Sequence, residues 1–347
     1  MKHQNAIAPL HIRPVLRTDI ADIRHLAKLL DTINLPKDPD AVAEMVSQSE
    51  ASIKRLTVSA QVPVAACNSI YMLVAVKGDR LLGTASLLSH HGTPDDPHYY
   101  LRVVEQTVHS TQLNSHHRRH LLQLGRDLEP WTELGGLVVH PEARGQGIGK
   151  LLLAARLMMV AKNPAWFCKR LLAELLPPRQ QDGSNAFWEA LGAPLTGLNY
   201  YRADLLCRTD KEFIESLFPR HQIVMELLPA EAQEVVGQVN AETVPVLHLL
   251  QRAGFSFLNT IDPFDGGPHY GASLEEVTPV QRCRSLVCLD HPPTEECANV
   301  LLAHPTLHQF HPIPAQICGD GLRITKPVIH SLHLHPGDLV WIMPLDW

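Results

Sequence analysis

A glycine-rich turn between an apolar strand and an apolar helix is the feature that most constrains the fold of this chain. Arg144 opens the turn, and Gly145, Gly147 and Gly149 follow at alternate positions. Glycine lets the backbone approach an anion closely and point several N–H groups at one place. A helix that begins at such a turn adds the positive end of its dipole. The pattern therefore predicts a strand–turn–helix unit that holds a phosphate or pyrophosphate group.

The spacing of the glycines separates this turn from other nucleotide-binding turns. No Ser or Thr follows Lys150, so the ending of the P-loop is missing. The third glycine comes two residues after the second, whereas the dinucleotide fingerprint has three. The remaining pattern, Arg-x-x-Gly-x-Gly after a strand, resembles the acyl-CoA signature of the GCN5-related N-acyltransferase (GNAT) superfamily. An ordinary strand-to-helix turn that only needs glycine is the structural alternative. The resemblance implies CoA binding by Leu137, Val138, Val139, Arg144, Gly145, Gln146, Gly147, Ile148, Gly149 and Lys150.

Composition narrows the class of protein. The chain has 347 residues, of which 45% are hydrophobic and 19% charged, enough for two or three domains with a sizeable core. A net charge of −6 does not favour a nucleic-acid partner. The seven cysteines are an odd number without a repeating spacing, which fits reduced thiols. No leader and no apolar run of membrane-spanning length is apparent, so we expect a cytoplasmic protein that does not bind membranes.

The order of expected elements matches the acyltransferase layout. Apolar periodicity and turn signals predict strands and helices at residues 11–15, 20–30, 40–53, 71–76, 81–88, 134–139, 150–162 and 171–176. The polar, histidine-rich residues 90–130 are expected to form a long excursion over the active face. We therefore predict an α+β GNAT fold, a mixed central sheet flanked by helices. The expected parts are a core domain at 1–205, an extension at 206–280 that completes the site, and a small β-rich domain at 281–347.

Several further blocks resemble arginine N-succinyltransferase, a family within the same superfamily. They are Val108-His109-Ser110, Glu133 with Leu137, Ala173-Glu174 with Phe187-Trp188, the block at 232–239 and Ile-Asp-Pro-Phe-Asp-Gly-Gly-Pro at 261–268. The β-rich tail resembles that of the family's alpha-chain variants. The resemblance implies transfer of a succinyl group from succinyl-CoA to the α-amine of L-arginine or L-ornithine, in arginine catabolism. It also implies a homo- or hetero-oligomer with a homologous chain.

Two positions depart from the family pattern. The family has a histidine proton donor directly after Gly-Gln-Val, and this chain has Asn240 there. Asparagine can hydrogen-bond but cannot exchange a proton near neutral pH. The family's Thr-Ser-Leu-Pro is Ile33-Asn34-Leu35-Pro36 in this chain. Two alternatives therefore stay open: an N-acyltransferase for another amine and another acyl-CoA, or a non-catalytic CoA-binding subunit that pairs with an active chain.

Amide formation from a thioester needs a polarised carbonyl, a deprotonated amine and a proton for the departing thiolate. Backbone N–H groups near Leu137 can polarise the carbonyl, although a plain core leucine is equally compatible. Glu133 is a candidate base, and a salt-bridged glutamate is the alternative. Glu174 is a candidate substrate-binding residue that, with Glu133, could bind a guanidinium group. His109 is a candidate for proton transfer, weighed against a total of 21 histidines.

No metal ion is expected from the sequence. No cysteine or carboxylate completes a site with His116, His117 and His120. A second set lacks paired Cys-x-x-Cys spacing and consists of Cys283, Cys288, His291 and Cys297.

Overall fold

The computed structural model describes residues 10–30, 35–36, 38–58, 69–180, 183–207, 210–287, 297–304, 312–318, 321–323, 334–335 and 337–347. Ile33, Asn34, Cys288 and His291 lie outside these ranges. The chain forms two compact units: the first combines Met1–His90, Thr132–Lys169 and Ser273–Trp347, and the second combines His91–Trp131 and Arg170–Ala272. Both units are built from segments far apart in sequence. The boundaries of these two units differ from those of the three expected parts, 1–205, 206–280 and 281–347. The three-part division stays a prediction.

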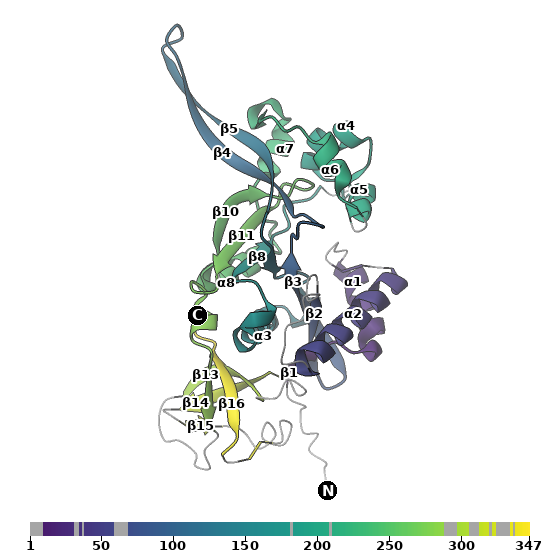
Figure 1. Ribbon diagram of the computed structural model, residues 1–347, viewed down its shortest axis with the longest axis vertical. Coiled ribbons are helices and arrows are strands. Elements are labelled where there is room, and N and C mark those ends of the chain that lie inside the picture. Colours follow the sequence, from purple (N-terminus) through teal and green to yellow (C-terminus); the bar gives the residue numbers. More distant parts are fainter. Residues whose placement is uncertain are drawn as a thin grey trace. The chain divides into compact units, whose positions relative to one another are not determined.

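The first unit is built on an antiparallel sheet (Figure 1). Strands β1 (Leu10–Pro14), β2 (Ile70–Lys77) and β3 (Arg80–His91) lie side by side. The short strands β6 (Trp131–Glu133) and β7 (Val138–Val139) follow on the other edge of β3. The apolar, β-branched sequence of β2 suits a strand that is covered on both faces.

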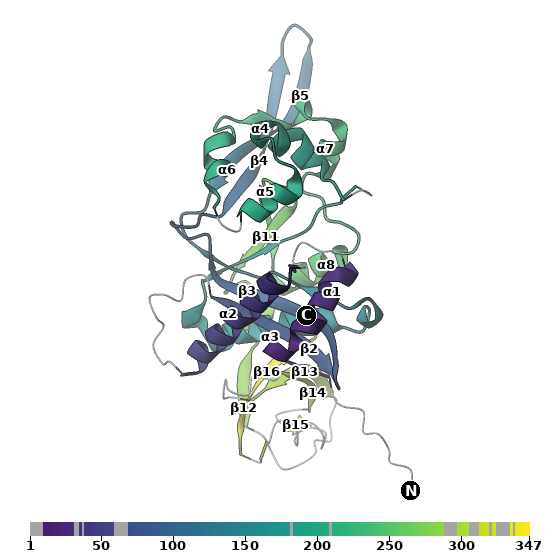
Figure 2. The same ribbon diagram turned by 90° about the vertical axis from the view of Figure 1, so that its right-hand side faces the viewer.

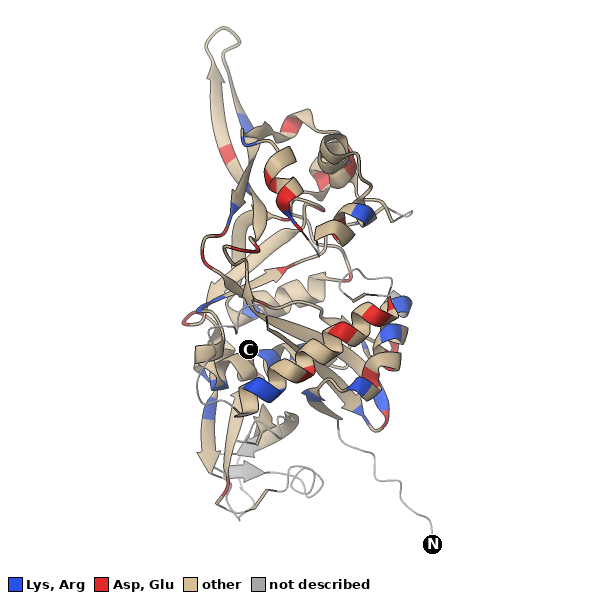
Figure 3. Cartoon of the chain, turned by 45° about the vertical axis from the view of Figure 1, so that its right-hand side comes forward, with Lys and Arg blue, Asp and Glu red and all other residues tan. Residues whose placement is uncertain are grey.

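Helices cover both faces of this sheet (Figure 1). Helices α1 (Ile20–Leu30) and α2 (Pro39–Val58), preceded by the short η1 (Arg17–Asp19), lie on one face. Apolar residues of both helices pack on Met72, Val74 and Val76 of β2. Charged residues are spaced along α2 in Figure 3, while Val42 and Val46 of the same helix are buried in the core. Helix α3 (Ile148–Lys162), on the opposite face, is buried along most of its length and follows the glycine turn.

A second, five-stranded sheet completes the first unit and confirms the predicted β-rich tail. Its strands are β12 (Arg284–Val287), β16 (Leu339–Pro344), β13 (Cys297–Ala303), β14 (Ile313–Cys318) and β15 (Gly321–Arg323), in that order. Helix α9 (Thr278–Gln281) precedes them and η3 (Pro164–Trp166) follows α3. The N–H of Ile12 in β1 donates to the carbonyl of Pro312 at 2.9 Å.

The second unit holds the strands β8 (Arg170–Glu174), β11 (Pro268–Ser273), β10 (Ser256–Ile261), β4 (Tyr99–Ser110), β5 (Ser115–Arg126) and β9 (Ile223–Val224), in that order. Strands β4 and β5 pair continuously from Tyr99↔Arg126 to Ser110↔Ser115. The expected excursion at 90–130 is therefore largely a β-hairpin, which extends past the helices of its own unit (Figures 1 and 2).

Short helices complete the second unit. They are η4 (Trp188–Gly192), α4 (Ala193–Thr196), α5 (Tyr200–Cys207), α6 (Glu212–Leu217), η5 (Met225–Leu227), α7 (Ala230–Val235) and α8 (Val244–Ala253). Their core contains Trp188, whose ring stacks on Phe264 with 5.0 Å between centroids. Among the described residues, no helix combines the length and the apolarity needed to span a bilayer.

Candidate active site

The glycine turn has the backbone geometry of an anion-binding loop. The φ angles of Gly145 and Gly147 are 76° and 78°, in the left-handed region that favours glycine. A Cβ atom at either position would meet nothing within 4 Å. The glycines are therefore required by conformation and not by packing, and one side of the turn is open. Helix α3 begins directly afterwards at Ile148, so the unpaired first N–H groups of the helix point toward the turn.

The strand that precedes this turn is broken into two short strands, β6 and β7. β6 ends at Glu133 and β7 begins at Val138, and Gly136 between them has a φ of 58°. The N–H of Ser86 in β3 donates to the carbonyl of Gly135 at 2.9 Å, which keeps the interruption beside β3. Leu137 lies in this break. Where a strand stops pairing with its neighbour, its backbone N–H and C=O groups become available for hydrogen bonds to a ligand.

A buried arginine forms hydrogen bonds beside the break in this strand. Arg156 of α3 is 1% exposed and donates to the carbonyl oxygens of Ser86 and Gly135, both at 3.2 Å. Burial lowers the pKa of Arg156 to about 9, and the negative charge of Glu133 acts in the opposite direction. Glu133, the candidate base, thus supplies negative charge to a buried guanidinium group. The role of Glu133 as the base, against a charge-paired glutamate, stays a prediction.

Lys150 connects the turn to the C-terminal segment of the same unit. Its Nζ donates to the carbonyl oxygens of Leu345 and Trp347, both at 2.7 Å. The same Nζ lies 4.7 Å from the centroid of the Trp347 ring. η2 (Pro141–Ala143) lies on the other side of the turn, and Arg80 forms a 2.7 Å ion pair there with Glu142. The ammonium group of Lys150 therefore binds protein carbonyls beside the predicted CoA site.

Asn240 has a structural role in the second unit. Its Oδ1 accepts from the N–H of Thr243 at 2.8 Å, and its Nδ2 donates to the carbonyl of Pro177 at 3.4 Å. Its backbone N–H donates to Leu176 at 3.0 Å. The amide thus ties the start of α8 to the segment after β8. Such a local bond from an Asn side chain to the backbone stabilises the turn that precedes α8.

His109 lies far along the β4–β5 hairpin. It is paired with His116, and the two rings are 4.4 Å apart. It is eight residues beyond Leu101, which pairs with Ile261 of β10. At ~3.4 Å per strand residue, this separation is about 27 Å. The structure therefore does not bring His109 together with Asn240 or Glu174.

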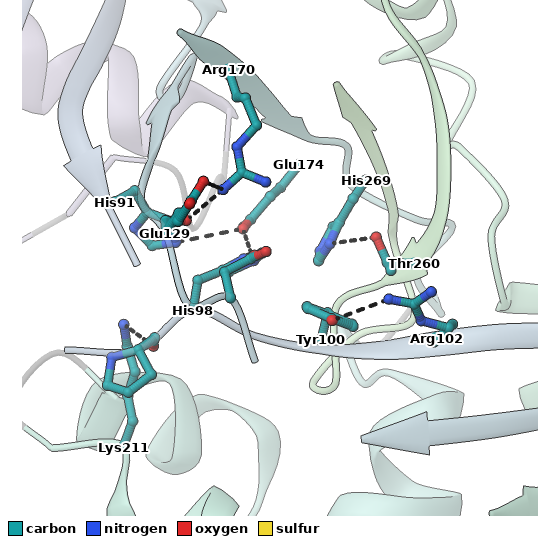
Figure 4. Close-up of polar contacts among 12 residues, drawn as sticks. His91, His98, Tyr100, Arg102, Glu129, Arg170, Glu174, Lys211, Thr260 and His269 are labelled. Carbon is teal, nitrogen blue, oxygen red and sulfur yellow. Dashed lines mark hydrogen bonds and ion pairs between the residues drawn. The ribbon is translucent and has the colours of Figure 1, made fainter. Parts of the chain in front are cut away.

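Glu174, the last residue of β8, lies in a cluster of histidines (Figure 4). Nε2 of His98 is 3.0 Å from Oε1 of Glu174, and Nδ1 of His98 is 2.7 Å from Oδ2 of Asp127. Nε2 of His91 is 3.9 Å from the same oxygen of Glu174. The ring of His269 lies 5.1 Å from that of His98. Three imidazoles therefore surround one carboxylate.

The charges in this cluster are coupled. Burial opposes a charged His98, but contacts with Asp127 and Glu174 outweigh it and raise the pKa of His98 to about 10. Burial likewise opposes ionisation of Glu174, but the His98 hydrogen bond holds the pKa of this carboxyl well below its usual range. Burial lowers the pKa of His91 to about 4 and that of His269 to about 3. The cluster thus contains one imidazolium between two carboxylates, flanked by two neutral imidazoles.

The Asp-Gly-Gly block forms a tight turn beside this cluster. Oδ1 of Asp265 accepts from the N–H of Gly267 at 2.8 Å. A Cβ at Gly267 would overlap the carbonyl oxygen of Leu175, so only glycine fits. Burial raises the pKa of Asp265 to about 7, and burial together with the charge of Asp265 raises the pKa of Asp262 well above its usual value.

The sequence analysis identified Glu174 but none of the residues around it as site candidates. His91, His98, Asp127 and His269 lie at or near strand ends that become neighbours only through the topology of the second unit. A high histidine content at 90–130 was the sole sequence signal. Glu133 and Glu174 fall in different units and have partners in their own units. Their joint binding of a guanidinium group stays a prediction.

The layered first unit, the interrupted strand and the glycine turn before α3 define a GNAT-type N-acyltransferase fold, which confirms the predicted fold class. Residues 10–279 match the family model described as arginine N-succinyltransferase beta subunit. The chain therefore belongs to the arginine N-succinyltransferase family, a family of acyltransferases, and the family prediction is confirmed.

Known relatives span nearly the whole chain. The arginine N-succinyltransferases of Escherichia fergusonii and Shigella flexneri are each 30% identical over 338 residues, 96% of this chain and 97% of the relative. The structure of arginine/ornithine succinyltransferase subunit AI from Pseudomonas aeruginosa is 24% identical, with a TM-score of 0.81 over 98% of this chain and 100% of that chain. At this identity the structural likeness shows the fold alone.

Proposed function

We propose that this chain transfers the succinyl group of succinyl-CoA to the α-amine of L-arginine or L-ornithine. The observation that carries the proposal is the open glycine turn at the start of α3, directly after an interrupted strand, in a member of the arginine N-succinyltransferase family. Thiol chemistry in a reducing compartment suits a CoA enzyme, and we keep the cytoplasm as the proposed location.

The turn would bind the pyrophosphate of CoA through the N–H groups of Gly145, Gly147, Ile148 and Gly149. Arg144 would add a positive charge at its edge. Backbone N–H groups in the break around Leu137 would polarise the thioester carbonyl as negative charge develops on its oxygen.

Proton transfer is assigned differently from the family pattern. Because the Asn240 amide cannot exchange a proton and its oxygen already accepts from the N–H of Thr243, it would position a group or a water molecule and not act as an acid. Glu133 remains the proposed base for the α-amine, directly or through water. Glu174 remains a proposed contact for the guanidinium group of the substrate, although His98 already contacts one of its oxygens.

Steady-state release of free thiol tests the proposal directly. We expect turnover with succinyl-CoA and arginine or ornithine, and slower turnover with acetyl-CoA. A preference for acetyl-CoA would support acylation of another kind. Absence of thiol release with every basic amino acid, from a folded chain that binds CoA, would contradict catalysis by this chain alone.

The structural hydrogen bonds of Asn240 favour one alternative. A chain whose family histidine is replaced by a structural amide could be a CoA-binding subunit that pairs with an active homologous chain. Light scattering of the isolated protein would measure whether it forms homo-oligomers. Mixing it with a homologous, active chain would then test hetero-oligomer formation and any gain in activity.

A further inference from the structure

We propose that His91, His98, Glu174 and His269 form a binding site for a divalent transition-metal ion, with Zn²⁺ as the ion that the donors suit best. The proposal revises the sequence-based expectation of no metal. It concerns the second unit alone and does not depend on the proposed acyl transfer.

The donor atoms lie in two groups that share Glu174. One ligand atom each from His91, His98 and Glu174 lies within 4.8 Å of the others, and the same holds for one ligand atom each from Glu174, Asp262 and His269. The distances from Oε1 of Glu174 are 3.0 Å to Nε2 of His98 and 3.9 Å to Nε2 of His91. Tetrahedral Zn²⁺ with ligands at ~2.0–2.1 Å holds them about 3.3 Å apart. These two distances lie on either side of this value, so small rotations of these three side chains suffice.

The outer nitrogen of two of these histidines is held as in known metal sites. Nδ1 of His98 contacts the Asp127 carboxylate at 2.7 Å, and Nδ1 of His269 contacts Oγ1 of Thr260 at 3.3 Å (Figure 4). A metal-binding histidine usually has a carboxylate or another polar group on its second nitrogen, which fixes the ring. These contacts leave Nε2 of both rings as the candidate ligand atom.

A buried nitrogen without a partner is the independent observation. The side chain of His269 is 0% exposed, and its Nε2 has no hydrogen-bond partner among the described residues. Such an atom carries a desolvation cost unless it binds something. An Asp127–His98–Glu174 ion chain explains His98 without a metal, but it leaves this nitrogen unexplained.

The types of ligand atom and their exposure to solvent indicate which kind of ion the site would bind. Imidazole and carboxylate ligands suit Zn²⁺ and its neighbours, whereas Mg²⁺ and Ca²⁺ prefer oxygen donors. The side chain of Glu174 is 31% exposed, so an ion can enter on its side and keep a water molecule or another ligand. The site thus combines buried imidazole nitrogens with one accessible carboxylate.

The test is metal binding by the full-length chain after chelator treatment and dialysis. Titration calorimetry with ZnCl₂ should give one tight equivalent, and CoCl₂ should give the visible absorption of a low-coordinate site. Glu174→Gln and His98→Gln should weaken Zn²⁺ binding by at least about 100-fold, since each removes a direct ligand. Asp127→Asn, which removes only the outer contact, should weaken it by about 10- to 100-fold.

The exposed pair His109 and His116 provides the matched control, because two adjacent imidazoles on a surface hairpin could bind an ion by chance. The double variant His109→Ala/His116→Ala should keep the tight equivalent. Loss of binding in this control with retention in the cluster variants would overturn the proposal, as would absence of tight binding in the unmodified chain. If circular dichroism shows that Glu174→Gln or His98→Gln does not fold, Asp127→Asn and His91→Gln decide the question.

Discussion

The glycine turn allows a sharp test, because its three glycines are predicted to tolerate alanine differently. Gly145 and Gly147 have φ angles of 76° and 78°, where an L-residue costs roughly 1–2 kcal/mol. Gly149 lies in the first turn of α3 without a positive φ, and its Cβ would be 3.9 Å from Cγ2 of Val139, an ordinary contact. Alanine there should stabilise the helix by about 0.5–1 kcal/mol.

Gly147→Ala and Gly149→Ala should therefore differ by about 1.5–3 kcal/mol in the free energy of unfolding, although each adds one methyl group within three residues. Urea-induced unfolding followed by circular dichroism measures this difference. Gly145→Ala should behave like Gly147→Ala. If all three variants unfold at the same urea concentration, the left-handed backbone is not what requires the glycines, and the reasoning is refuted.

The same variants separate the effect of these glycines on stability from their effect on CoA binding. A methyl group at Gly145 or Gly147 meets no protein atom, so it projects into the open side of the turn where the pyrophosphate would bind. We expect CoA affinity to fall by at least about 10-fold in folded Gly147→Ala, measured by calorimetry. This corresponds to ~1.4 kcal/mol of binding free energy. Wild-type CoA affinity in all three folded variants would show that the pyrophosphate binds elsewhere.

Three further predictions concern buried polar groups. Arg156→Met should lower the free energy of unfolding by roughly 1–3 kcal/mol, because it removes the donor to the carbonyl oxygens of Ser86 and Gly135 and a positive charge near Glu133; adding Glu133→Gln should recover only the part due to charge, measured by urea unfolding. The folded-state pKa of Asp265 is about 7 against a reference of 3.8, so the folded state binds more protons, and this group's contribution to stability is lost as pH rises from about 4 to 7. Asp265→Asn mimics the protonated acid and should be more stable than the wild type at pH 8 but not at pH 4; equal pH dependence in both proteins would contradict the raised pKa. Asn240→His should raise kcat by up to about 100-fold and add a pH-dependent limb near pH 6.5 if this position can transfer a proton, whereas an unchanged pH–rate profile would exclude it from that step.

The sequence predicted well those parts of the fold that are determined by residues close together in the chain. The helix expected at 150–162 is α3 (Ile148–Lys162), because an apolar run directly after a glycine turn has few alternatives. The hairpin expected around Lys77 is β2 and β3 for a similar reason, since two apolar runs flank a short turn. In the turn itself, the glycines predicted a backbone that can approach an anion closely, and Gly145 and Gly147 adopt left-handed conformations there.

The long hairpin shows where local reasoning fails. Strands β4 and β5 pair over their full length, but many of their outer residues are exposed. Without a buried face, selection does not impose the alternation of apolar and polar residues by which strands are found. Residues 90–130 were therefore predicted only as a long polar excursion. The sequence does not show that the pairing of β4 with β5 places His109 far along the hairpin.

The histidine cluster could not be predicted from the sequence for a topological reason. His91 and His269 are separated by most of the second unit's sequence, and with His98 and Glu174 they lie at or beside the ends of β3, β11, β4 and β8. Among 21 histidines, no spacing singles out these three. They meet because strand β8 lies beside β11 and because the segment before β4 returns to the end of β8. Nε2 of His269 is buried and has no hydrogen-bond partner among the described residues, and a bound ion would offset the desolvation cost of this atom, which the ion pairs of His98 do not.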